Sequence, residues 1–141
     1  MEISKETKLL AGILLLTVPS IQFGGMFLLR LIRTRDAGYF ENPVRQGLFR
    51  AGHAHAGVLV ILSLVCQILA DAASGPSWAM WIARLGAPAA AILIPLGFFL
   101  SVASPEAATP GNFIRSAYIG VATLALSVVS LGVLLVRSAV I

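Results

Sequence analysis

The chain alternates long apolar stretches with short segments that hold its charged residues. Four stretches of 20 or 21 residues contain no Asp, Glu, Lys or Arg, and they are bounded by Lys8 and Arg30, Arg50 and Asp71, Arg84 and Glu106, and Arg115 and Arg137. An α-helix needs about 20 apolar residues to cross the hydrocarbon core of a bilayer. The pattern therefore predicts four transmembrane helices, over residues 9–33, 50–71, 79–103 and 113–138.

The connections between these spans are short, so consecutive spans run antiparallel. We expect an all-α fold, an integral membrane antiparallel four-helix bundle, built by residues 1–141 as a single membrane domain. Small residues recur three or four positions apart in the last span, a spacing that lets helices approach closely in lipid: Ser116, Gly120, Thr123, Ser127 and Ser130. Packing within one subunit and packing between subunits would both use such a stripe.

The composition argues against a water-soluble domain. Hydrophobic residues make up 58% of the chain and charged residues only 11%, whereas a soluble domain has about 25% charged residues. The net charge of +4 does not indicate nucleic acid as a partner, because the basic residues stand at the ends of the spans. There they set membrane topology.

Arginines crowd the first loop, which predicts that this loop and the third loop face the cytoplasm and that both termini lie outside. We expect the protein in a bacterial inner membrane, in contact with the lipid bilayer. Arg84 lies near the start of the third span, where its side chain would extend back to the interface. Tyr39 and Phe40 suit the membrane interface, and Asn42 and Pro43 predict the start of a short interfacial helix that continues into the second span.

Both histidines of the chain, His53 and His55, lie near the start of the second span. Ionisable residues inside spans are rare and indicate a functional site by default. On a regular helix these two side chains point about 200° apart, so they cannot bind one ion together. At most one of them faces the interior of the bundle.

Small residues surround both histidines, so nearly two turns of helix carry no large side chain other than the imidazoles. These residues are Ala51, Gly52, Ala54, Ala56 and Gly57. This gives room for a broad, flat ligand such as haem, whose iron can be held by one histidine. Close packing, with a histidine hydrogen-bonded to a neighbouring span, is the alternative.

The antiparallel order brings other side chains to the depth of the histidines. Aromatic residues would form the walls of a site there: Phe98, Phe99 and Phe113. Arg45, Arg50 and Arg115 would stand at its mouth, where a guanidinium group matches the carboxylates of haem propionates. Topology alone would also explain these arginines.

Other catalytic arrangements are missing from the sequence. No carboxylate lies well inside a span, so neither a Ser-His-Asp set nor a pair of carboxylates can form there. One cysteine, Cys66, and two histidines are too few for a zinc site in one subunit. No glycine-rich phosphate loop follows a strand.

Three short stretches resemble the styrene oxide isomerases, a family of small four-span membrane enzymes. Residues 54–57 (AHAG) are similar to the A-H-S-G stretch of that family, and residues 97–105 (GFFLSVASP) to its aromatic-rich run that ends in S-P. Residues 110–114 (PGNFI) are similar to its P-G-D-I-F turn. Chain length, number of spans and loop order also agree.

The resemblance implies a protein that binds haem b at the subunit interfaces of a homotrimer. It implies that His55 is the axial ligand of the iron. With a haem held there, we expect His53, Arg45 and Arg50 as neighbours or propionate partners, beside the small residues Gly52 and Gly57. In the family, ferric iron acts as a Lewis acid on the oxygen of a small apolar epoxide, which opens and rearranges to an aldehyde. This chemistry needs an open coordination position on the iron.

The sequence departs from the family at the catalytic positions. The catalytic tyrosine of the family falls on Phe98 or Phe99, its asparagine near Ile61, and the arginine before the histidine on His53. The first hypothesis is therefore a haem-dependent isomerase of an epoxide or another small apolar substrate, with His55, or else His53, on the iron. The others are a non-enzymatic haem protein for sensing, carriage or electron transfer, and a cofactor-free helical scaffold or accessory subunit.

Overall fold

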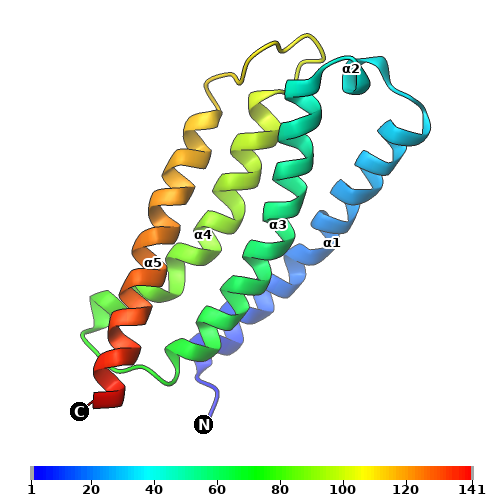
Figure 1. The fold of residues 1–141 in the computed structure, drawn as a ribbon. Helices are drawn as coiled ribbons and strands as arrows, with labels where there is room; N and C mark the ends of the chain where they lie inside the picture. Colours follow the sequence, from blue (N-terminus) through cyan, green and yellow to red (C-terminus); the bar gives the residue numbers. More distant parts are fainter. Residues whose placement is uncertain (1, 141) are drawn as a thin grey trace.

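Four long helices run antiparallel along the whole length of the molecule (Figure 1). The computed structural model describes residues 2–140 and contains α1 (Lys5–Arg33), α2 (Ala37–Phe40), α3 (Pro43–Ala70), α4 (Ser77–Ser101) and α5 (Ile114–Val140). The four long helices are all long and apolar enough to cross a membrane. They confirm the predicted all-α four-helix bundle and mark the chain as an integral membrane protein.

Two helices begin earlier than the charge pattern predicts, because capping residues precede the apolar stretches. The Ser4 hydroxyl accepts a hydrogen bond from the Thr7 amide at 3.2 Å, so α1 begins at Lys5. The Asn42 side chain accepts one from the Arg45 amide at 3.0 Å, and Pro43 occupies the first turn of α3. Both features favour a helix start. The segment predicted as a short interfacial helix is therefore the first two turns of α3.

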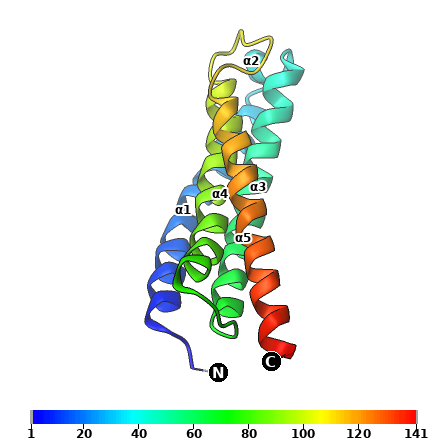
Figure 2. The ribbon, with the colours of Figure 1, turned by 90° about the vertical axis from the view of Figure 1, so that its left-hand side faces the viewer.

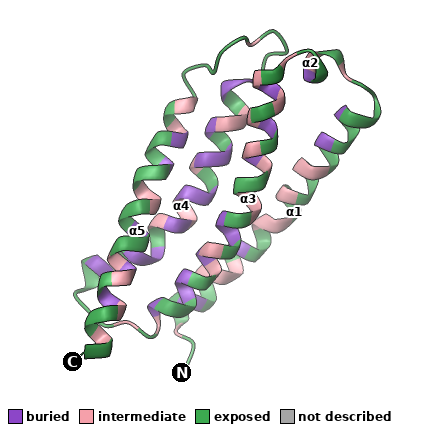
Figure 3. Cartoon of the chain, in the orientation of Figure 1, coloured by how far each residue is buried: buried purple, intermediate pink, exposed green. Residues whose placement is uncertain are grey.

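The helices pack in the order α1, α3, α4, α5, and α4 is the centre of the bundle. In the most apolar window of each helix, 44% of the residues of α4 are buried, against 11% of those of α1 (Figure 3). Helix α4 packs mainly against α5 and α3, whereas α1 packs mainly against α3. Figure 2 shows α2 and the connection from α4 to α5 at one end of the bundle and both termini at the other.

The small residues of α5 serve packing within this subunit. A Cβ atom on Gly97 would lie 2.5 Å from the backbone nitrogen of Ala117, so α4 and α5 approach as closely as their backbones allow. The Ser127 hydroxyl, which is fully buried, donates a hydrogen bond to the Ala83 carbonyl at 2.7 Å. The Ser116 hydroxyl donates to the Leu93 carbonyl at 2.8 Å. Of the two uses that the sequence allowed for this stripe, the structure shows the packing of α5 on α4.

Arg84 does not extend back to the interface as predicted. Only 7% of the residue is exposed, and its guanidinium group pairs with Asp71 and donates a hydrogen bond to the Thr7 hydroxyl at 2.7 Å. The guanidinium group can stay inside the bundle because Asp71, directly after α3, supplies the opposite charge. The Gln67 side chain, also fully buried, donates to the Arg84 carbonyl at 2.7 Å.

Candidate functional site

The two histidines lie on different sides of α3, as the helix geometry predicts. His53 turns toward α1, where its ring lies against two consecutive glycines. His55 is exposed, and its ring meets Phe98 of α4 edge-on with 5.4 Å between ring centroids. The two imidazoles therefore belong to two separate environments.

The His55 ring is held by its own helix. Its Nδ1 lies 2.7 Å from the carbonyl oxygen of Ala51, one turn earlier in α3. A carbonyl only accepts hydrogen bonds, so Nδ1 carries the proton and the neutral ring has an unprotonated Nε2. The lone pair of Nε2 is the group that a metal ion would bind.

Two exposed positions near His55 on α3 carry a small side chain or none, although Val58, one turn further along the helix, is 64% exposed. Ala54 is exposed, and a Cβ atom on Gly47 would meet nothing within 4 Å. A Cβ atom on Gly57 would also meet nothing, but Gly57 lies two residues after His55 and therefore on the His53 side of α3. Gly52 differs from them, because a Cβ atom there would lie 3.0 Å from the Phe99 ring. Gly52 therefore serves the contact between α3 and α4.

The two aromatic residues at the end of α4 have different neighbours. Phe98 contacts His55, and Phe99 contacts Phe49 with 5.3 Å between ring centroids. This confirms that these two aromatic residues lie beside the histidine region. Phe113, the third predicted wall residue, is 58% exposed.

Arg45 has partners within the chain that hold one end of the bundle together. Its guanidinium group donates hydrogen bonds to the carbonyls of Val102 at 3.2 Å, Gly38 at 3.1 Å and Ala103 at 3.4 Å. Its Cζ lies 4.7 Å from the centroid of the Phe49 ring. The positive charge of Arg45 thereby offsets the partial negative charge of the carbonyl groups at the C-terminal end of α4. Arg50, in contrast, is exposed.

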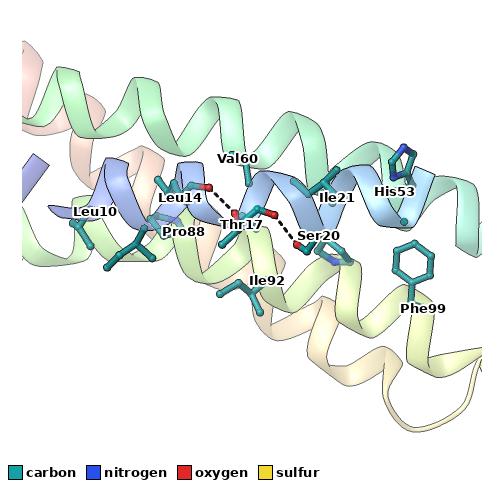
Figure 4. Close-up of a pocket in the computed structure, with 15 residues that line it drawn as sticks. Leu10, Leu14, Thr17, Ser20, Ile21, His53, Val60, Pro88, Ile92 and Phe99 are labelled. Atoms are coloured by element: carbon teal, nitrogen blue, oxygen red, sulfur yellow. Dashed lines mark hydrogen bonds between the residues drawn. The ribbon is translucent and has the colours of Figure 1, made fainter. Parts of the chain in front are cut away.

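His53 contributes to a pocket that opens on the side of the bundle, between α1, α3 and α4 (Figure 4). The volume of this pocket is about 300 Å³. A Cβ atom on Gly25 would lie 3.1 Å from Cε1 and Nε2 of His53, so the glycine lets the ring lie flat against α1. This contact between His53 and α1 was not predicted, although the dipeptide Gly24-Gly25, at the depth of the histidines, was a signal for it.

A second polar group of residues lies at the end of the bundle that holds the termini. The Asp71 carboxylate accepts hydrogen bonds from the Ser4 amide at 3.0 Å and the Ser4 hydroxyl at 2.7 Å, in addition to its ion pair with Arg84. Burial raises the pKa of Asp71, but the hydrogen bonds from Arg84, Ser4 and Thr7 outweigh it and hold this pKa below its usual range. Because its charges pair with each other and join α1, α3 and α4, this cluster has the character of a structural junction.

Within residues 2–140 no three His, Cys, Asp or Glu side chains come close enough together to hold a metal ion. A haem iron needs no such group, since its four porphyrin nitrogens leave one axial position to a single histidine. The site residues thus allow a prosthetic group bound through one imidazole.

No family model, no curated protein and no solved structure matches the chain. Its four long apolar helices and their packing define it as a four-helix integral membrane protein.

Proposed function

We propose that this protein binds haem b at the membrane-embedded surface of α3 and that His55 supplies the axial ligand of the iron. The observation that carries the proposal is the 2.7 Å contact between His55 Nδ1 and the Ala51 carbonyl. Histidines that bind metals donate their other ring N–H to a carbonyl or carboxylate, which fixes the tautomer and orients the ring. The His55 ring is thus already oriented by the Ala51 carbonyl in the way that metal-binding histidines are.

The exposure of His55 supports the proposal. An imidazole that faces hydrocarbon with an unpaired ring nitrogen is unfavourable, because lipid offers it no hydrogen bond. A ligand that covers the exposed ring and bonds to Nε2 removes this penalty. The small residues Ala51 and Ala54 beside the ring give a planar macrocycle close access to this part of the helix.

The size of the pocket beside His53 favours His55 over His53 as the ligand. At roughly 30 Å³ per heavy atom, the value for liquid water, the pocket of about 300 Å³ holds about ten heavy atoms. A porphyrin has several times more. The surface at His55 sets no such limit, and a second copy of the chain would complete the enclosure of a haem that lies on it. The homotrimer expected from the resemblance fits this requirement.

Arg50 is the better candidate for a propionate partner. Arg45 already donates to three backbone carbonyls, and diverting it would leave those carbonyls unpaired. Arg50 is exposed at the same end of α3, where its guanidinium group can reach a carboxylate at the interface. Guanidinium groups match carboxylates with two parallel hydrogen bonds.

Haem with an open coordination position would supply Lewis-acid chemistry of the kind that isomerises epoxides in the family this sequence resembles. The chain's part is to hold the His55 ring, to exclude water and to admit a small apolar substrate from the bilayer. A non-enzymatic haem protein is the second candidate. It is favoured by the apolar surroundings of His55, where Phe98 offers no hydrogen-bonding group to a substrate.

An absorption spectrum of the protein, purified in detergent from haem-supplemented cells, tests the proposal. We expect a Soret band that His55→Ala removes and that His53→Leu, the matched change on the other side of α3, leaves in place. No Soret band in the unchanged protein would overturn the proposal and favour the cofactor-free scaffold. Full haem content in His55→Ala, with loss in His53→Leu, would move the ligand to His53.

The same samples separate the two haem hypotheses. A five-coordinate iron that binds added imidazole, together with turnover of styrene oxide to the aldehyde, would support the isomerase. A six-coordinate low-spin iron, with both axial positions filled by protein and no turnover, would support sensing, carriage or electron transfer.

A further inference from the structure

The pocket beside His53 is a long slot that runs parallel to the helices. Its residues on α1 extend from Leu10 to Gly24, and those on α4 from Pro88 to Phe99. At 1.5 Å of rise per residue, the α1 wall is about 21 Å long. A volume of about 300 Å³ spread over this length leaves a narrow space, which suits a slim molecule better than a bulky one.

Small residues and prolines explain why the slot exists. Ala56 and Ala91 line it from α3 and α4, where larger side chains would fill it. Pro19 lies inside α1, and Pro88 and Pro95 lie inside α4. A proline removes a helical hydrogen bond and bends the helix. Small side chains on α3 and α4 and prolines within α1 and α4 therefore favour a space between the three helices.

The walls of the slot are apolar and carry no charge. None of its lining residues is Asp, Glu, Lys or Arg. The Thr17 hydroxyl donates to the Leu14 carbonyl and the Ser20 hydroxyl donates to the Thr17 carbonyl, each at 2.6 Å, so both hydroxyl protons are already used (Figure 4). A charged ligand would find no counter-ion here, so the slot suits a neutral molecule.

His53 is the one side chain of this slot whose polar groups lack a partner. No hydrogen bond joins its ring to any residue drawn around the pocket in Figure 4. A neutral imidazole has one N–H donor and one nitrogen acceptor. Leaving both unpaired in an apolar site is costly, and a hydroxyl group on a bound molecule would satisfy either of them.

We infer that the slot binds a slim, neutral, apolar molecule of about ten heavy atoms with one hydrogen-bonding group at its end, such as a medium-chain alcohol. Its polar end lies on His53 and its chain runs along α1 and α4 toward Leu10. The molecule enters sideways from the bilayer. This site lies on the opposite side of α3 from His55, and the inference goes beyond the proposed function without using it.

A photoreactive ligand tests the inference. The probe is a medium-chain primary alcohol with a diazirine on its chain, used with the protein in phosphatidylcholine nanodiscs, and labelled residues are mapped by mass spectrometry. We expect labelling within residues 10–24 and 88–99, with competition by excess 1-octanol. A probe of equal length that ends in a methyl group should label these segments much less.

Matched variants locate the two halves of the site. Ala56→Leu fills the slot and should abolish labelling, whereas Ala54→Leu, on the exposed side of the same helix, should leave it unchanged. His53→Leu should weaken competition by 1-octanol about 2- to 13-fold, the value of one hydrogen bond of 0.5–1.5 kcal/mol. His53→Gln retains a hydrogen-bond donor and an acceptor, so competition by 1-octanol should return to most of its original strength in this variant.

Three results would overturn the inference. Equal labelling by the methyl-ended probe would show that the slot takes lipid chains without regard to His53. Labelling spread over lipid-facing residues such as Leu16 and Val129 would show partition into the bilayer alone. Equal competition in His53→Leu and in the unchanged protein would remove His53 from the site. The slot of His55→Ala should be labelled normally even when this variant has lost its haem. Failure of the slot inference can therefore be distinguished from failure of the haem proposal.

Discussion

Nη2 of Arg84 lies 2.6 Å from Oδ1 of Asp71, and 9% and 3% of the two side chains are exposed. Arg84 belongs to α4, and Asp71 is the residue that directly follows α3. The same two side chains also contact α1 and the residue before it, through Thr7 and Ser4. One buried ion pair therefore joins three of the four long helices at the end of the bundle that holds the termini.

Removing the negative charge of this pair should destabilise the fold strongly. In Asp71→Asn the Arg84 guanidinium group stays buried without its counter-ion, a change that costs about 3–5 kcal/mol in the free energy of unfolding. Unfolding in detergent, followed by circular dichroism, measures the loss. Glu6→Gln removes an exposed carboxylate nearby and should stay within about 0.5 kcal/mol of the unchanged protein. Equal effects of the two changes would contradict the junction assigned to Asp71.

The same carboxylate should make stability depend on acid pH. The pKa of Asp71 is lower in the folded protein than its usual value, which in an unfolded chain is about 3.9. The unfolded state therefore takes up this proton first as the pH falls. The stabilisation is complete above about pH 5 and decreases below about pH 4. Asp71→Asn should flatten this part of the curve of stability against pH, and an unchanged slope in the variant would assign the effect to other carboxylates.

The close contact of α4 and α5 should tolerate no added carbon at Gly97. Its Cβ atom would lie 2.5 Å from the Ala117 backbone, and overpacking of this kind costs about 1–3 kcal/mol. Gly132→Ala is the matched control, because a Cβ atom there meets nothing within 4 Å. Alanine favours the helix over glycine by about 0.5–1 kcal/mol, so this control should be neutral or stabilising. Thermal unfolding that ranks the variants in the opposite order would refute the packing described here.

Phe98 should influence how well haem is retained. Its edge-on contact holds one side of the His55 ring, and contacts of this type are worth about 0.5–1.5 kcal/mol. Phe98→Ala should therefore lower haem affinity about 2- to 13-fold, measured by transfer of haem to an apo-globin acceptor. Phe113→Ala removes an exposed aromatic residue from the third loop and serves as the control. The same affinity in both variants would show that His55 is oriented by Ala51 alone.

Topology can be tested without purifying the protein. The arginine-rich first loop predicts that both termini lie outside the cytoplasm. An alkaline phosphatase domain fused after residue 141 should be active, and one fused within the first loop should be inactive. The reverse pattern would invert the assignment and place the histidines near the outer face of the membrane.

The sequence was sufficient to predict the four spans, because each apolar stretch has the length that a bilayer requires. The placement of His53 and His55 on different sides of α3 also followed from the spacing of two residues. The predicted starts of two helices were less accurate, because Ser4 and Asn42 cap helices that begin within polar segments, which a charge count assigns to loops. The capping residues themselves indicate the true starts.

The partners of the buried arginines could not be predicted from the sequence. Arg45 and Arg84 are both near the ends of spans, where extension toward water is the usual behaviour. Their actual contacts depend on where distant segments meet: Arg84 with Asp71, and Arg45 with the carbonyls that end α4. The slot beside His53 is a similar case, because it is formed by three helices and no single stretch of sequence encodes it.

Helix α1 contacts the rest of the bundle at three levels. Ser4 and Thr7 join it to the Asp71 junction, Leu14 packs in the core of its middle part, and Leu28 and Leu31 join it to the core at the other end. Three residues of the slot, Leu14, Val60 and Ala91, belong to that middle core as well. The slot therefore shares its inner wall with the core, and a molecule too thick for it would have to displace the side chains that hold the bundle together.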